Sequence, residues 1–263
     1  MSAVGLRTLV VGCRGMLGAD LMRTLGTDPA YGPIECADLP EINICDPDNL
    51  RDFFEDQQFD VIFNCAAYTD VDGCETHRDE AFDVNANGVG HLAGIAASQD
   101  ARLVHVSTDY VFDGSRSEPY TEEDEPRPLN AYGESKLEGE RQLRASSARW
   151  VMLRTAWLYG SEGRNFVDEV MRLARDKKEL SGVTDQVGSP TWTLDLSHTL
   201  AAVGKTDAEG VFHAVNEGAC SRFEQMQWIV KCAGFDSRIK PVTSETFPRP
   251  AQIPPTVQLS TDK

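Results

Sequence analysis

The sequence of 263 residues predicts an α/β fold in which helices cover both faces of a doubly wound parallel sheet. Short apolar segments recur along the first 155 residues without polar alternation, as is typical of strands that are buried on both faces. Segments with helical spacing separate these runs. A glycine-rich turn at positions 12–18 follows the first run, where such a fold binds its ligands.

The elements alternate in chain order. The expected strands are 8–11, 34–37, 61–65, 103–106, 151–153 and 211–215. Helices are expected at 16–25, after the N-cap pair Asp46-Pro47, around Leu92, Ile95 and Ala96, around positions 132–136, and at 165–175, 194–203 and 223–232. The proline-rich segment 247–255 is expected to be an extended loop, and the element signals are weaker beyond position 160.

The charge balance excludes some partners. The sequence has 42 acidic and 25 basic residues, a net charge of −17, and no basic stripe, so we expect no nucleic acid partner. It has no apolar run of the roughly 20 residues that a membrane span needs, nor a signal-peptide pattern, so we expect a cytoplasmic protein without a membrane partner. The acidic surface fits either a well-solvated protein or one adapted to high salt.

The cysteines and histidines form no recognisable metal site. Seven cysteines are present, an odd number, and none forms a C-x-x-C pair. We expect free thiols in a reducing cytoplasm rather than disulfides. The five histidines show no ligand spacing, so no metal site is expected.

The glycine turn predicts a dinucleotide-binding site. Gly12, Gly15 and Gly18 let the backbone approach a pyrophosphate, and the helix that starts with Met16 and Leu17 favours its negative charge. Two nearby residues give opposite indications of the cofactor. Asp38, 20 positions after Gly18, can accept hydrogen bonds from ribose hydroxyls and favours NAD. Arg14, within the turn, can neutralise a 2′-phosphate and favours NADP.

A hydroxyl, a phenol and an ammonium group suggest carbonyl reduction. Tyr132 and Lys136 lie four positions apart, hence on one face of a helix, and Thr108 ends a predicted strand. Tyr132 can give a proton to a carbonyl oxygen, because the charge of Lys136 lowers the pKa of the phenol. Thr108 can orient the carbonyl with a hydrogen bond.

With these residues the sequence resembles the dTDP-4-dehydrorhamnose reductase family of the extended short-chain dehydrogenase/reductase superfamily, over about residues 7–250. The segments that carry the resemblance are NCAAYTDVD at 64–72, VNA at 84–86, STDYVFDG at 107–114, PLNAYG at 128–133, RTAWLYG at 154–160, NFV at 165–167, DQVG at 185–188 and PT at 190–191. The resemblance implies a Rossmann domain at 1–160 that binds NAD(P) and a substrate-binding lobe, mainly at 161–263, interleaved with the last strands.

The resemblance also implies roles for single residues. Thr108, Tyr132 and Lys136 match the catalytic triad, and Tyr132 and Lys136 also contact the cofactor. The implied sugar-binding residues are Thr108, Asp109, Tyr110, Tyr132 and Trp157, and the implied cofactor-binding residues outside the glycine turn are Asn43, Ile44, Ala66, Ala67 and Thr69. Some members of the family form a metal-bridged dimer, but Leu194 stands at one of its carboxylate positions, so no metal is carried over.

The implied activity is reduction of the 4-keto group of a nucleotide-linked 6-deoxy sugar, dTDP-4-dehydro-L-rhamnose first, by NADPH or NADH. The resemblance favours NADPH modestly, and a homodimer is possible. Two alternatives stay open: a reductase for another nucleotide-linked keto sugar, and a non-catalytic regulator that binds NADP without turnover.

Overall fold

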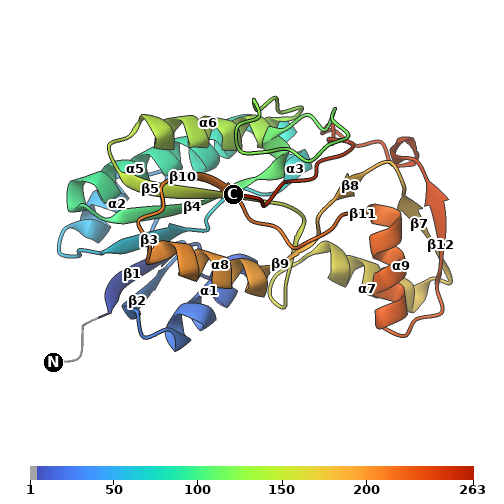
Figure 1. The fold of residues 1–263 in the computed structure, drawn as a ribbon, viewed down its shortest axis with the longest axis horizontal. Coiled ribbons are helices and arrows are strands. Elements are labelled where there is room, and N and C mark those ends of the chain that lie inside the picture. The colour runs from blue at the N-terminus through green and yellow to red at the C-terminus, as the bar shows by residue number, and fades with distance from the viewer. Residues whose placement is uncertain (1–4) are drawn as a thin grey trace.

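The computed structural model describes residues 5–263 and consists of a layered α/β domain with a smaller lobe beside it (Figure 1). The expectation of no signal peptide concerns in part residues 1–4, which lie outside the described residues. The central sheet has six parallel strands in the order β10-β5-β4-β3-β1-β2. Their bounds are β1 Leu6–Val11, β2 Tyr31–Ala37, β3 Val61–Asn64, β4 Arg102–Thr108, β5 Arg149–Thr155 and β10 Gly210–His213.

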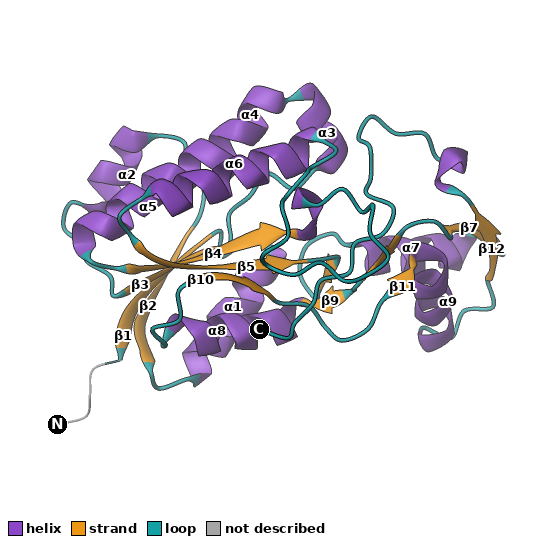
Figure 2. Ribbon diagram, turned by 45° about the horizontal axis from the view of Figure 1, so that its top comes forward, coloured by secondary structure: helices purple, strands orange, loops and turns teal. Residues whose placement is uncertain are grey.

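Helices cover both faces of this sheet, so the predicted doubly wound fold is confirmed (Figure 2). One face carries α1 Met16–Thr27 and α8 Thr193–Gly204, and the other carries α2 Pro47–Phe54, α5 Gly88–Gln99 and α6 Ala131–Ala145. Each face has its own apolar core: Leu21 and Leu200 lie in one, and Leu50, Leu92 and Leu143 in the other. Buried apolar side chains on both faces of each strand explain why its sequence does not alternate.

Short elements follow β3 and β4 on the α6 face. They are α3 Val71–Thr76, α4 Arg78–Phe82, a π-helical turn at Asp83–Asn87 and a 3₁₀ turn at Asp109–Val111. Asp70 caps α3, because its side chain accepts a hydrogen bond from the amide of Gly73. The sequence prediction did not include these turns, because each is too short to show a helical period.

The smaller lobe has its own sheet and core. It consists of α7 Phe166–Asp176, β7 Glu179–Val183, α9 Arg222–Cys232 and β12 Arg238–Val242, and β7 pairs in parallel with β12. Val170, Leu180 and Met226 lie in its apolar core. The sequence prediction missed both strands of this lobe. Proline in β12 is tolerated because this strand has a neighbour on one side only.

Short strands and a C-terminal segment complete the structure. The paired strands are β6 Leu158–Tyr159 with β9 Thr191–Trp192, and β8 Val187–Gly188 with β11 Cys220–Ser221. The proline-rich segment follows a 3₁₀ turn, Ser244–Thr246, and is a loop with several bends; that it is a loop was predicted. It returns to the α/β domain, where Leu259 bridges to Tyr120. None of the helices within residues 5–263 combines the length and the apolarity that crossing a bilayer requires.

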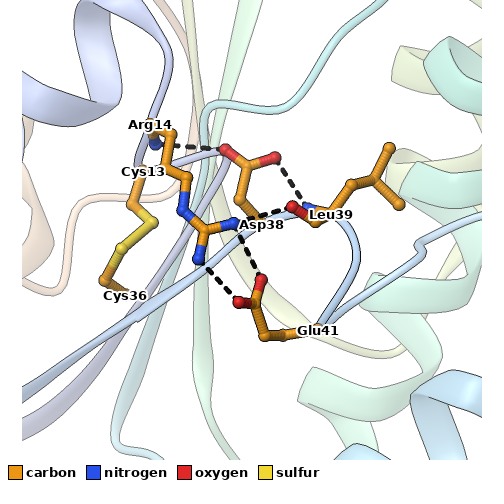
Figure 3. Close-up of a disulfide and its surroundings, with 6 residues drawn as sticks. All are labelled: Cys13, Arg14, Cys36, Asp38, Leu39 and Glu41. Carbon is orange, nitrogen blue, oxygen red and sulfur yellow. Dashed lines mark hydrogen bonds and ion pairs between the residues drawn. A yellow bond between two sulfur atoms is a disulfide. The ribbon is translucent and has the colours of Figure 1, made fainter.

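The prediction that all cysteines are free is wrong. Cys13, in the glycine turn, and Cys36, in β2, form a disulfide, whereas the other five cysteines are free (Figure 3). The two cysteines are 23 positions apart, and the parallel pairing of β1 with β2 brings them together. The sequence prediction failed because no local spacing pattern reports a contact that tertiary structure creates.

Removing this disulfide is expected to lower the stability of the protein. A cross-link around a loop of this length restricts the unfolded chain and contributes about 3 kcal/mol in the chain-entropy model. For a chain of this size, the double variant Cys13→Ser/Cys36→Ser should melt roughly 6 to 12 °C below the wild type. Melting temperatures measured with and without a reductant check this. The reductant should lower the value of the wild type only, and an unchanged wild-type value contradicts the expectation.

Candidate active site

Two cavities lie at the carboxyl ends of β1, β3 and β4, where the sheet topology predicts a site. The strands β1 and β3 are neighbours, but the helix that follows β1 covers one face of the sheet and the helices that follow β3 cover the other. Doubly wound proteins bind their ligands at such a switch point. The volumes of the cavities are about 490 and 340 Å³. Gly15, Cys65 and Ala67 line both, so the two cavities are adjacent.

The glycine turn lies where the two cavities meet: Gly15 lines both of them, and Gly12 lines the smaller one. Gly12 has a φ of +76°, a backbone conformation that favours glycine, and a Cβ there would lie 2.6 Å from the amide nitrogen of Ala66. Gly15 is the N-cap of α1 and provides no capping side chain, so amide groups in the first turn of α1 are free to bind an anion. The turn therefore fits the pyrophosphate of a dinucleotide.

The smaller cavity contains most of the residues predicted to bind the adenosine end of the cofactor. Asp38, Asn43, Ile44, Ala66 and Ala67 line it, together with Gly12 and Gly15. The larger cavity is lined by Gly15, Met16, Leu17, Gly18, Ala67 and Thr69 on its cofactor side. Arg14 is absent from both linings among the described residues, because its guanidinium pairs with Glu41 instead.

The larger cavity also contains the predicted catalytic residues. Thr108, at the end of β4, and Tyr132 and Lys136, on α6, all line it, although they are distant in the sequence. Asn130 fixes the start of α6, because its side chain accepts a hydrogen bond from the amide of Gly133. Tyr132 and Lys136 therefore lie one turn apart on the helix face that meets β4.

A buried ion pair fixes the position of α6 against the sheet. Arg154 of β5 donates to both carboxylate oxygens of Glu140, at 2.9 and 2.7 Å, and both side chains are 1% exposed. Ser107 of β4 donates to the same carboxylate at 2.7 Å. Glu140 lies one turn after Lys136, so these bonds hold the catalytic face of α6 in register with the end of β4.

Lys136 is almost completely buried. Its Nζ donates a hydrogen bond to the backbone oxygen of Val106 at 2.8 Å, and the side chain is 2% exposed. Burial lowers the pKa of Lys136 to about 8, although Glu140 and Cys65 act in the opposite direction. A lysine pKa lowered this far in a cavity is typical of a functional site.

Tyr132 keeps its proton in this site. Burial raises the pKa of its phenol above the ordinary value, and the neighbouring Asp109 and Tyr110 act in the same direction, whereas a hydrogen bond with Thr108 lowers it. The ring of Tyr110 packs edge-on against that of Tyr132, with 5.4 Å between the centroids. The expected lowering of the phenol pKa by Lys136 is not found: desolvation has the largest effect on this pKa, and Lys136 is not among the groups that lower it.

Asp109 and Tyr110, predicted to bind the sugar, follow Thr108 and line the same cavity. The hydroxyl of Thr108 donates to Asp109 Oδ1 at 3.0 Å and accepts from the amide of Tyr110 at 3.3 Å. Asp109 is 3% exposed, and burial raises the pKa of its carboxyl group to about 7. The end of β4 therefore presents a hydroxyl, a carboxyl group and a phenol to one ligand.

Trp157 lines the cavity from the side of the smaller lobe. Its φ of +46° is uncommon for a bulky residue. The guanidinium of Arg222, at the start of α9, lies 3.3 Å from the centroid of the Trp157 ring and 4.6 Å from that of Phe166. This cation–π contact holds the indole in place.

The sequence prediction missed two arginines near the site. Arg222 gave no signal, because only the packing of the smaller lobe brings it to Trp157. Arg164 also lines the larger cavity. It lies in the loop directly before Asn165, the N-cap of α7, and loops often carry binding residues.

A doubly wound fold with a glycine turn and a Thr/Tyr/Lys cavity defines the class of NAD(P)-dependent short-chain dehydrogenase/reductase proteins. Residues 6–263 match the family model described as RmlD substrate binding domain. The chain is 46% identical over 199 residues to a dTDP-4-dehydrorhamnose reductase of Mycobacterium tuberculosis; the alignment covers 73% of the chain but 66% of that protein, just under two thirds of its length.

Two further comparisons agree. A dTDP-4-keto-6-deoxy-D-glucose reductase of Streptomyces niveus is 36% identical over 242 residues, which cover 91% of the chain and 83% of that protein. The crystal structure of dTDP-4-dehydrorhamnose reductase from Bacillus anthracis in complex with NADP has a TM-score of 0.94 and 34% identity, and the match covers 98% of the chain and 91% of that structure. The chain therefore belongs to the dTDP-4-dehydrorhamnose reductase family, which carries the RmlD substrate binding domain.

Proposed function

We propose that this protein reduces the 4-keto group of a nucleotide-linked 6-deoxy sugar with NADPH or NADH, and that its substrate is dTDP-4-dehydro-L-rhamnose. The observation that carries the proposal is the convergence of Thr108, Tyr132 and Lys136 in one cavity beside the glycine turn. Membership of the family and the names of the relatives support the choice of substrate.

The roles of the residues follow from the chemistry of a ketone. Residues that line the larger cavity, Lys136 among them, would hold a reduced nicotinamide, which when bound would supply the hydride that the carbonyl carbon accepts. The hydroxyl of Thr108 turns from Asp109 to the substrate, so that Thr108 and Tyr132 both donate hydrogen bonds that orient the carbonyl oxygen. Tyr132 transfers its proton to that oxygen as the hydroxyl forms. The ammonium of Lys136 stabilises the phenolate that this transfer leaves.

The smaller lobe is proposed to bind the nucleotide part of the substrate. Arg164 lines the larger cavity where α7 begins, and a diphosphate carries negative charge that an arginine can bind. Trp157 and Tyr110 both line the larger cavity and present aromatic rings for the sugar. A homodimer and a cytoplasmic location are part of the same proposal. The five free cysteines favour that location, whereas the Cys13–Cys36 disulfide does not.

The test is a turnover assay with a panel of nucleotide-linked 4-keto sugars. Oxidation of NADPH or NADH with dTDP-4-dehydro-L-rhamnose, giving dTDP-L-rhamnose, is the expected result. Turnover with a different keto sugar supports the alternative substrate, which the Streptomyces relative favours. Cofactor binding without oxidation across the panel contradicts the proposal and identifies a non-catalytic regulator.

The activity is expected to fall as the pH rises above about 8. Lys136 acts as a cation, and its pKa of about 8 means that the charge is complete below this pH and is lost above it. Tyr132 titrates at higher pH, so the lysine loses its proton first. A profile of log kcat/KM against pH should descend with a slope of about −1 above this point.

The variant Asp109→Asn shows whether Lys136 or Asp109 causes the fall in activity at high pH. The carboxyl group of Asp109 has a pKa of about 7, so the two groups titrate close together. If deprotonation of Lys136 causes the decrease of log kcat/KM at high pH, the decrease persists in the variant. If the decrease is absent in Asp109→Asn, the carboxyl group causes it, and the expectation is contradicted.

A further inference from the structure

The end of the cofactor site that holds the adenosine ribose has an acidic lining. The residues described around the smaller cavity include Asp38 and Glu80 but no lysine, arginine or histidine. The 2′-phosphate that distinguishes NADPH from NADH carries almost two negative charges and needs a cationic partner. The nearest candidate in the sequence, Arg14, therefore decides whether the extra phosphate is accommodated.

Arg14 is held by partners of the protein itself (Figure 3). Its two terminal nitrogens donate to the carboxylate of Glu41 at 2.7 and 2.9 Å, and one of them also donates to the backbone oxygen of Leu39 at 2.7 Å. A bidentate pair of this kind fixes the plane of the guanidinium as well as its position. The cation that would recognise a 2′-phosphate is thus bound to a carboxylate on the loop after β2.

Asp38 is fixed next to this pair. Its carboxylate accepts hydrogen bonds from the backbone amides of Arg14, at 3.1 Å, and Leu39, at 2.9 Å. Each oxygen keeps a further lone pair that can accept from a ribose hydroxyl. The charges of Asp38, Arg14 and Glu41 sum to −1, which repels a phosphate but not a hydroxyl group.

We propose that Glu41 is a specificity-determining residue that withholds Arg14 from the 2′-phosphate, so that this protein prefers NADH to NADPH. In the sequence, Asp38 favours NAD and Arg14 favours NADP. Because Arg14 is paired with Glu41, the indication from Asp38 decides, and it favours NADH. The inference concerns the cofactor and rests on binding of NAD(P)H, not on the identity of the sugar.

The test is direct titration of the protein with NADH and with NADPH, without a sugar, in the wild type and in Glu41→Gln. The wild type should bind NADH more tightly. Glu41→Gln frees Arg14 and removes one negative charge, so the Kd of NADPH should fall by about three- to tenfold, as a charge-assisted pair of this kind allows. The Kd of NADH should change by less than about twofold, because a ribose hydroxyl is neutral.

The control is Glu169→Gln. Glu169 forms the same kind of exposed, bidentate pair with Arg172, but on α7 in the smaller lobe. The substitution Glu169→Gln changes the net charge by the same amount as Glu41→Gln. If it raises the affinity for NADPH equally, total charge causes the effect, and the proposal is overturned.

The double variant Arg14→Ala/Glu41→Gln tests whether the gain depends on Arg14. If it does, the Kd of NADPH returns toward the wild-type value. A gain that persists without Arg14, a wild type that prefers NADPH, or an unchanged ratio in Glu41→Gln each overturn the proposal. Because titration needs no turnover, these outcomes are independent of whether the proposed sugar is the substrate.

Discussion

Replacing Tyr132 with phenylalanine is expected to lower kcat by about 10²-fold or more while cofactor binding survives. The substitution removes the phenolic proton that the carbonyl oxygen receives and keeps the ring, whose edge-on contact with Tyr110 fills the same space. Single-turnover oxidation of NADH or NADPH with the keto sugar measures the effect on the chemical step. Titration with the reduced cofactor shows that the site is intact.

Tyr110→Phe is the matched comparison for this variant. It removes a hydroxyl from the neighbouring ring in the same cavity, so it reports what the loss of any phenol there does to activity. We expect a decrease of less than about tenfold, since a hydrogen bond to the substrate contributes about 0.5–1.5 kcal/mol. A Tyr132→Phe variant with near-normal kcat would assign the proton donor to another residue.

Replacing Gly18 with alanine is expected to weaken cofactor binding by about 10²-fold or more. A Cβ at this position would overlap the carbonyl oxygen of Gly12 and lie 2.7 Å from the Cα atom of Cys13. Both neighbours are backbone atoms of the turn and cannot move aside like a side chain. The turn must shift relative to α1, which displaces the amide groups proposed to bind the pyrophosphate.

Gly26→Ala, in the same helix, is the control. A Cβ at Gly26 meets no atom within 4 Å, and alanine is the better helix former, so stability should stay equal or rise slightly. Titration with NADH and the melting temperature of both variants check the pair. If Gly18→Ala binds NADH like the wild type, the turn does not hold the cofactor as proposed.

Much of the site could be predicted because its residues act through local patterns. The N-cap Asp46 starts its helix as the following proline predicts. Tyr132 and Lys136 share a helix face because their spacing is four, and Thr108 ends a strand because the apolar run stops there. These features depend on neighbours in the chain, so the sequence contains all that is needed to predict them.

The contacts that the prediction missed join residues far apart in the chain. Cys13 meets Cys36 through the pairing of β1 with β2, and Arg222 meets Trp157 through the packing of the smaller lobe. Strand β12 was missed because a strand with one neighbour needs neither strict alternation nor an unbroken apolar run.

The sequence by itself determined the fold class, the family and the positions of the proposed catalytic residues, since strand and helix periods and short motifs are local properties. Tertiary structure alone decided which charge meets which. In the sequence, Arg14 favoured NADP and Asp38 favoured NAD, and nothing decided between the two cofactors. In the structure Glu41 binds Arg14, because the loop after β2 lies against the glycine turn and its carboxylate accepts from both terminal nitrogens of the guanidinium.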